Sequence, residues 1–129
     1  MERVKSKSNK RLIIEGEVNG KSAYFLLDTG ASVGFMDRSQ ARKYGLEEGR
    51  KFGSTVVGAG GEMKNVHYCT TMLNYYGKKI PQFLIANIGG VVESIEHETG
   101  LKILGIVSLP QMRIAGLGID ANDNEIIIE

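Results

Sequence analysis

The sequence predicts a mostly β domain, a small closed or partly open β-barrel with one or two short helices. Three observations support this fold class. Short apolar runs of strand length alternate with turn residues, an Asn-Gly pair at 19–20 separates two such runs, and helix signals occur at only two places. The chain has 129 residues, of which 42% are hydrophobic and 24% are charged. This makeup suits one globular core and excludes a second full domain.

The first two strands are expected on either side of Asn19 and Gly20. Residues 12–18 and 22–27 are strand-like runs, and Asn-Gly supplies the positive φ angles of a type I′ turn. The sequence therefore predicts a β-hairpin here.

The N-terminal segment 1–10 carries four basic residues among serines. It is too polar to pack, so we expect a mobile basic arm, followed by a single domain over residues 11–129.

Two short helices are expected. Asp37 and Gln40 form a potential capping box, and Gly45 suits the position that ends a helix. Ser108, with Pro110 two residues later, predicts the start of the second helix.

A glycine-rich tip at 58–61 lies between two extended runs, 52–57 and 62–73. Because this tip has almost no side chains, we expect a mobile hairpin.

The C-terminal half is expected to continue as strands. A return strand is predicted at 79–85, and a polar loop at 120–124 separates strands at 113–119 and 125–128. Residues 87–100 show no clear pattern.

Charge and composition exclude several classes of partner. Sixteen basic and fifteen acidic residues give a net charge of +1, so no overall field favours nucleic acid or an anionic membrane. No apolar stretch reaches the roughly 20 residues of a bilayer-spanning helix. The single cysteine, Cys69, cannot form an internal disulfide, and no secretory signal is recognisable. We therefore expect a cytoplasmic location.

The most informative motif is Asp28, Thr29 and Gly30. A carboxylate comes directly after a buried strand and is followed by a small hydroxyl residue and a glycine that permits a tight turn. The motif resembles the Asp-Thr-Gly active-site loop of aspartic peptidases, and the chain length places it with the single-lobe, retropepsin-like (acid protease) members of bacterial type.

Other segments resemble the same family in order and spacing. The Asn-Gly hairpin precedes the motif, a helix follows it, and the glycine-rich tip looks like the family's flap. Ile103, Leu104 and Gly105 match the element of two apolar residues and a glycine that packs against the active-site loop.

The resemblance implies an aspartic endopeptidase that works as a homodimer. Hydrolysis by this route needs two carboxylates that share a proton and bind one water. Asp37, Asp120 and Asp123 lack both the preceding apolar strand and the following glycine, so the second carboxylate is expected from another copy of the chain. The partner is a peptide or protein substrate, and no cofactor or metal is expected.

The resemblance also assigns roles to individual residues. Asp28 activates the water, Thr29 joins the two loops across the dimer axis, and Gly30 forms the turn. The expected substrate-binding residues are Ala31, Val57, Gly58, Ala59, Gly60 and Ile106. The expected supports of the active-site loop are Ser32, Ile103, Leu104 and Gly105.

The chain also departs from the viral members of the family. In those members, the residue two positions after the glycine of the Asp-Thr-Gly motif is acidic. The residue after the glycine of the second motif, which here is Ile103, Leu104 and Gly105, is arginine. These two residues pair near the dimer interface. Here these residues are Ser32 and Ile106. That ion pair is therefore absent.

Two other functions fit parts of the sequence. A fold of this type can serve as a catalytically silent, dimeric peptide-binding module. Separately, residues 30–34 match the Gly-x-Ser-x-Gly nucleophile elbow of serine hydrolases, with Ser32 as nucleophile. The serine hydrolase fold needs more parallel strands and a late histidine, for which 129 residues leave little room.

Overall fold

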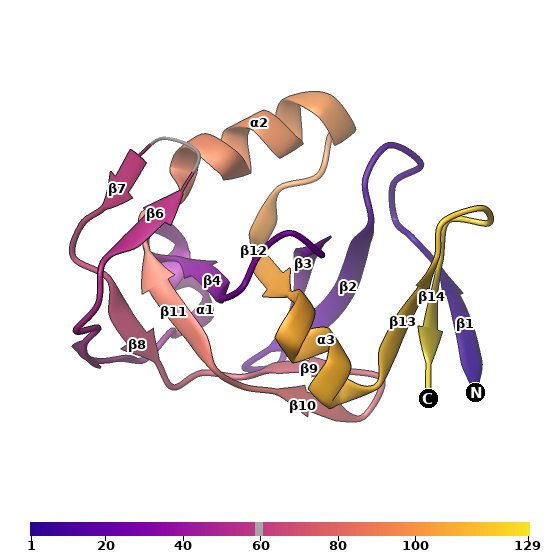
Figure 1. Cartoon of the computed structure of the whole chain (residues 1–129), viewed down its shortest axis with the longest axis horizontal. Coiled ribbons are helices and arrows are strands. Elements are labelled where there is room, and N and C mark those ends of the chain that lie inside the picture. Colours follow the sequence, from indigo (N-terminus) through magenta and orange to yellow (C-terminus); the bar gives the residue numbers. More distant parts are fainter. Residues whose placement is uncertain (59–60) are drawn as a thin grey trace.

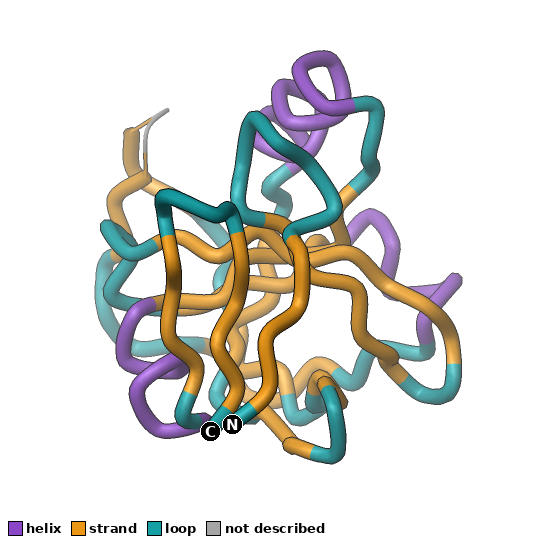
Figure 2. The backbone as a smooth tube through the Cα atoms, turned by 90° about the vertical axis from the view of Figure 1, so that its right-hand side faces the viewer, coloured by secondary structure: helices purple, strands orange, loops and turns teal. Residues whose placement is uncertain are grey.

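The computed structural model describes residues 1–58 and 61–129. A strongly curled sheet forms a half-barrel, and a separate small sheet is built from the two ends of the chain (Figures 1 and 2). The large sheet has the order β10-β9-β2-β3-β12-β4-β11-β8-β5. Its strands are β2 Ile13–Val18, β3 Lys21–Asp28, β4 Gly34–Asp37, β5 Glu48–Lys51, β8 His67–Cys69, β9 Leu73–Tyr75, β10 Lys78–Ile80, β11 Phe83–Ala86 and β12 Ile103–Ser108.

The remaining strands form two smaller sheets. The small terminal sheet has the order β1-β14-β13, and β6 pairs with β7 in a hairpin. These strands are β1 Glu2–Lys5, β6 Val56–Gly58, β7 Gly61–Met63, β13 Leu117–Asp120 and β14 Glu125–Ile128. The helices in the described residues are α1 Ala41–Tyr44, preceded by a 3₁₀ turn at Arg38–Gln40, α2 Gly89–Thr99 and α3 Leu109–Ala115. None of these helices is long and apolar enough to cross a membrane.

The centre of the large sheet positions the ends of two strands side by side. β12 runs parallel to β3 and antiparallel to β4, and β4 runs parallel to β11. In the β3–β12 register, Asp28 lies opposite Ser108. The expected catalytic loop and the start of α3 therefore leave the sheet at the same edge.

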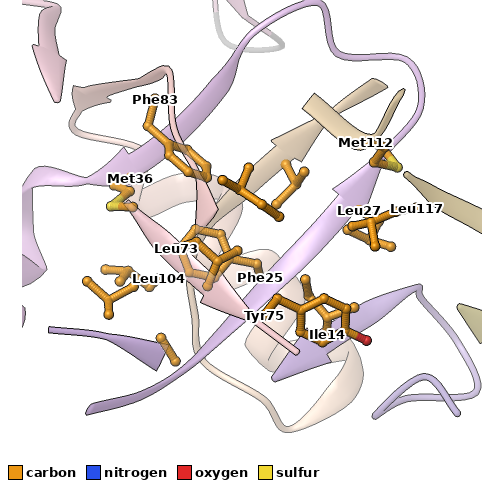
Figure 3. Close-up of a cluster of buried hydrophobic side chains, with 14 of the residues drawn as sticks. Ile14, Phe25, Leu27, Met36, Leu73, Tyr75, Phe83, Leu104, Met112 and Leu117 are labelled. Atoms are coloured by element: carbon orange, nitrogen blue, oxygen red, sulfur yellow. The ribbon is translucent and has the colours of Figure 1, made fainter. Parts of the chain in front are cut away.

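The main core lies inside the curl of the sheet. Figure 3 shows Phe25, Met36, Phe83 and Leu104 pointing toward one another from β3, β4, β11 and β12. Each of the four is at most 1% exposed. A second apolar cluster packs β12 against α2. With one cysteine and no disulfide, burial of these side chains is the main stabilising contribution.

Local turn and cap signals are confirmed by the backbone. Asn19 and Gly20 have φ angles of 51° and 81°, as the β2–β3 hairpin requires. Gly45, with φ 65°, ends α1, and Ser108 caps α3. Asp37 caps the 3₁₀ turn, but the Gln40 amide donates to the Asp37 carboxylate instead of to its backbone.

The N-terminal segment differs from the expected mobile arm. Residues 2–5 form β1, which pairs with β14 over its whole length. Arg3 donates to Asp120 at 2.8 Å and to Glu125 at 3.3 Å, and half-buried Val4 packs against the main core. The polar strand β1 is ordered because its main chain pairs with the apolar strand β14 and because Arg3 forms ion pairs with acidic residues beside the β13–β14 turn.

The helices and C-terminal strands also differ from expectation. Residues 87–100, without a clear pattern, contain the 11-residue helix α2, so the described residues have more than two helices. The strand expected at 113–119 begins only at Leu117, because α3 extends to Ala115. The strand expected at 79–85 is divided into β10 and β11, since proline at 81 has no N–H and Gln82 has a φ of 67°.

One ion pair ties the 3₁₀ turn to β5. Arg38 donates to Glu48 at 2.8 and 3.2 Å and also to the carbonyl oxygens of Asn65 and Ile85. The Arg38 guanidinium lowers the pKa of Glu48. A lowered folded-state pKa stabilises the protein above the unfolded-state pKa, and that contribution disappears as pH falls through the folded-state value.

We therefore expect Glu48→Gln to reduce the free energy of unfolding at pH 7 by no more than about 1 kcal/mol, because both side chains are partly solvated. The difference from wild type should shrink as pH falls below the ordinary glutamate pKa of 4.5. Urea unfolding of both proteins at pH 7 and pH 3 measures this difference in the free energy of unfolding. Glu93→Gln, on the exposed side of α2, is the control. An equal difference at both pH values would contradict the charge-based account.

Candidate active site

Asp28 is the last residue of β3 and is held by the turn that follows. The Gly30 N–H donates to Asp28 Oδ1 at 3.0 Å, and the Ala31 N–H donates to the Asp28 carbonyl at 3.1 Å. Asp28 is half-buried, whereas Thr29 and Gly30 are exposed. The sequence forms this turn because a short carboxylate can accept from the backbone two residues on. One carboxylate oxygen is thereby fixed in direction.

The second motif, formed by Ile103, Leu104 and Gly105 of β12, lies beside the Asp28 loop. The Leu109 N–H donates to the Ala31 carbonyl at 3.2 Å, which joins the Asp28 loop to the start of α3. Ile103 and Leu104 are fully buried. A Cβ atom on Gly105 would lie 2.1 Å from the Phe35 carbonyl oxygen, so β4 pairs with β12 at a distance that only glycine permits.

Gln111 is a supporting residue that the sequence reasoning missed. Its Oε1 accepts from the Ser108 N–H at 2.9 Å and from the Ser108 hydroxyl at 3.0 Å, and its Nε2 donates to the Pro81 carbonyl at 2.8 Å. A Cβ on Gly34 would lie 2.0 Å from the same Oε1. Serine followed three residues later by glutamine is a capping-box signal that could have identified it.

Two of the expected substrate-binding residues, Ala31 and Ile106, come together. Ile106 belongs to the second apolar cluster, and Ala31 packs against it. The same cluster includes Ile95 of α2, and Met63 of the β6–β7 hairpin packs against it. Val57 does not join them, because its side chain is 74% exposed.

The β6–β7 hairpin occupies the place of the expected flap. Gly58 pairs with Gly61, and Val56 packs against a third apolar cluster at the base of the hairpin. In Figure 1 the hairpin lies near one end of α2. Ala59 and Gly60, also expected to contact substrate, lie outside the described residues.

The structure gives Ser32 no support as a nucleophile. Ser32 is exposed, and within the described residues its hydroxyl has no hydrogen-bond partner. The chain continues from it into strand β4, whereas a nucleophile elbow leads into a helix. The His67 ring bonds the Gly49 carbonyl at 3.0 Å, so this imidazole is directed at β5.

No second carboxylate joins Asp28 in the described part of the chain. Asp37 is 1% exposed and caps the 3₁₀ turn, accepting from Ser39 and Gln40. Asp120 pairs with Arg3, which lowers the pKa of that carboxyl.

Three acidic residues lie close enough together to be considered as metal ligands. Oxygens of Asp120, Asp123 and Glu125 lie within 4.8 Å of one another. Arg3 already donates to two of them, and the group is partly exposed. We assign no metal to it.

Comparisons with known proteins agree with this geometry. Residues 14–90 match the family model described as aspartyl protease. No curated protein sequence matches the chain. Many solved structures share the fold, three of them as follows, each at low sequence identity.

The first is the EIAV protease complexed with the inhibitor HBY-793, at 20% identity and a TM-score of 0.64, covering 91% of this chain and 99% of that one. The second is the retroviral protease-like domain of Ddi1 from Leishmania major, at 20% identity and a TM-score of 0.61, covering 92% and 88%. The third is a retropepsin-like aspartic protease from Rickettsia conorii, at 18% identity and a TM-score of 0.57, covering 98% and 88%. With a mostly β, retropepsin-like fold and a family match over most of its length, the chain belongs to the aspartyl protease family.

Proposed function

We propose that the chain is an aspartic endopeptidase that acts as a homodimer, with Asp28 from each copy forming the catalytic pair. One observation carries the proposal. The Asp28 carboxylate is held at the end of β3 by the Gly30 N–H, and no other carboxylate of the described residues is hydrogen-bonded to it. A half site of this kind is completed by a second copy.

The chemistry follows from two carboxylates at contact. Like charges so close cannot both ionise, so the pair holds one proton. The ionised Asp28 takes a proton from the bound water as the water attacks the peptide carbonyl carbon. The protonated Asp28 donates to the carbonyl oxygen, which gives a neutral gem-diol. One Asp28 then donates a proton to the leaving nitrogen while the other takes a hydroxyl proton, so the amine leaves without a covalent enzyme intermediate and the pair again holds one proton.

Exposed groups around Asp28 are suited to meet a second copy and a substrate. The Thr29 hydroxyl has no partner among the described residues, so it is free to bond the other copy's loop. Ala31 and Ile106 offer apolar surface beside the carboxylate. The β6–β7 hairpin is suited to pair with an extended peptide through main-chain hydrogen bonds and to exclude water as it closes.

The test is cleavage of an unbiased peptide mixture by wild type and Asp28→Asn at high protein concentration, from about pH 4 to pH 8, where a shared-proton pair operates. We expect wild type to cut and Asp28→Asn to lose activity by about a thousandfold, because the general acid and base are removed. Asp123→Asn, the same change at an exposed carboxylate of the β13–β14 turn, is the control and should keep full activity.

Two outcomes would contradict the proposal. Equal cleavage by wild type and Asp28→Asn would show that Asp28 is not the catalytic group. Dimers that bind peptide without cutting it would identify a peptide-binding module instead.

A further inference from the structure

One cleft in the described residues lies outside the Asp28 site. A cleft of about 430 Å³ opens between β1, β2 and the β9–β10 turn, and we call it the β1–β2 cleft. Its lining includes Lys5, Lys7, Glu15, Glu17, Tyr75 and Tyr76. None of the described residues that line it comes from the Asp28 loop or the β6–β7 hairpin. Its volume falls within the range of about 300–1,000 Å³ that is usual for ligand sites.

One wall of the cleft is an open strand edge. At one end of this edge of β2, the Lys7 N–H donates to the Ile13 carbonyl and the Ile13 N–H donates to the Ser6 hydroxyl, both at 2.9 Å. Further along the same edge, Glu17 pairs with Asn74 of β9. Alternation along an antiparallel strand places the Glu15 N–H and C=O on this edge too. Within the described chain they have no hydrogen-bond partner.

The facing wall is the free edge of β1. The Ser6 N–H donates to the Asn124 carbonyl at 2.9 Å, which sets the alternation of β1 against β14. The Lys5 main chain therefore points away from β14 and toward the cleft. An exposed strand edge with free main-chain groups is what an extended polypeptide pairs with when it adds a strand to a sheet.

One residue that lines the cleft carries a buried, unpaired polar group. Tyr75 is 2% exposed, and its hydroxyl is the one buried side-chain oxygen or nitrogen of the described residues without a hydrogen-bond partner. Figure 3 shows this ring beside Ile14, with its oxygen turned away from Phe25 and Leu73. Burial raises the pKa of Tyr75, so the hydroxyl keeps its proton and remains a donor. A buried donor without an acceptor is costly and is rarely kept without a reason.

Charges in the cleft favour one kind of occupant. Lys7 lies 3.7 Å from Glu15, and Lys5 donates to the Asp123 carbonyl at 3.0 Å, so both cations already have partners. Glu17 is exposed and has no ion pair among the described residues. We propose that the β1–β2 cleft binds a short extended peptide segment, which pairs with the Glu15 main chain, accepts a hydrogen bond from Tyr75 and places a basic side chain beside Glu17.

Binding is tested in the Asp28→Asn chain, so that the probe is not consumed. The probe is the capped peptide Ac-Thr-Val-Lys-Val-Thr-NH2, added to ¹⁵N-labelled protein while the backbone amide signals are followed by NMR. We expect saturable shifts at Glu15, Glu17 and Tyr75. A second probe with glutamate in place of the lysine should bind about two- to fivefold more weakly, as the loss of one exposed ion pair implies.

Tyr75→Phe separates a binding role from a structural one. Removing an unsatisfied hydroxyl should raise the melting temperature of the free protein, yet weaken binding of the lysine probe by about three- to tenfold, the worth of one hydrogen bond. Tyr68→Phe, on β8 outside the cleft, is the matched control and should change neither quantity. A purely structural hydroxyl would change stability alone.

Three results would overturn the proposal: no saturable shift at Glu15, unchanged probe affinity in Tyr75→Phe, or concentration-dependent shifts at Glu15 without probe, which would assign the cleft to a second copy of the chain. These readouts do not depend on hydrolysis. Failure of the proposed peptidase activity would therefore leave this test intact.

Discussion

Mixing equal amounts of wild-type and Asp28→Asn chains is expected to leave about a quarter of the activity of wild type at the same total concentration, because random pairing makes only that share of dimers fully wild type. If each chain contained a complete site, the mixture would instead retain about half of the activity, since each wild-type chain would act alone. The two outcomes differ by a factor of about two, which a titration of the mixing ratio resolves.

The physical basis is the single carboxylate at the end of β3. A mixed dimer has one Asp28 and one amide, so the pair can no longer both accept a proton from water and donate one to the substrate carbonyl. Mixing with Asp123→Asn should leave activity unchanged and controls for the effect of adding a second variant chain. Activity that falls only in proportion to the wild-type fraction would contradict the shared site.

Gly105→Ala is expected to lower the free energy of unfolding by about 2–4 kcal/mol, among the larger effects of a single substitution. The added Cβ would lie 2.1 Å from the Phe35 carbonyl oxygen and 2.8 Å from the Phe25 ring, whereas real Cβ contacts essentially never fall below 3.0 Å. Because the nearest atom is backbone, β4 must move away from β12. Urea unfolding followed by circular dichroism measures the loss.

Gly118→Ala is the matched control for that substitution. Gly118 also lies in a strand, β13, but an added Cβ there would meet its nearest neighbour, Ile127, at an ordinary 3.6 Å. Its effect should stay within about 1 kcal/mol, the strand preference of alanine over glycine. Equal losses in the two variants would show that the close approach of β4 to β12 is not what requires glycine.

Features set by neighbouring residues were the predictable part of the fold. Asn19 and Gly20 determine their own turn, and Gly45 ends its helix, because each of these conformations depends on residues a few positions away. Strand β1 was not predictable in this way. Its four residues are exposed or half-buried, and their pairing depends on β14 at the other end of the chain.

Helix α2 was missed for a related reason. It begins with two glycines and has no side-chain cap, so the usual start signals are lacking. Val92 and Ile95 do follow helical spacing, and Gly100 suits a C-cap, but two buried residues are a weak periodic signal until the apolar surface of β12 is known.

Within the candidate site, the sequence predicted the Asp28 turn better than the lining. Asp28 and Gly30 form a local turn, so their arrangement follows from three consecutive residues. Whether a side chain lines a pocket depends on which face of a strand it occupies. Val57 was expected beside Ala31 and Ile106, yet the pleat of β6 directs Val56 inward and leaves Val57 to solvent.

The pairing of β1 with β14 also bears on the order in which the molecule folds. The ion pair between Arg3 and Asp120 joins residues 117 positions apart. On a ribosome, β1 emerges long before its partner β14, while the β2–β3 hairpin can already form from local contacts. Contacts of such long sequence separation form slowly. Closure of the small terminal sheet is therefore a late event in folding, and a nascent chain that still lacks β14 exposes the unpaired edge of β1.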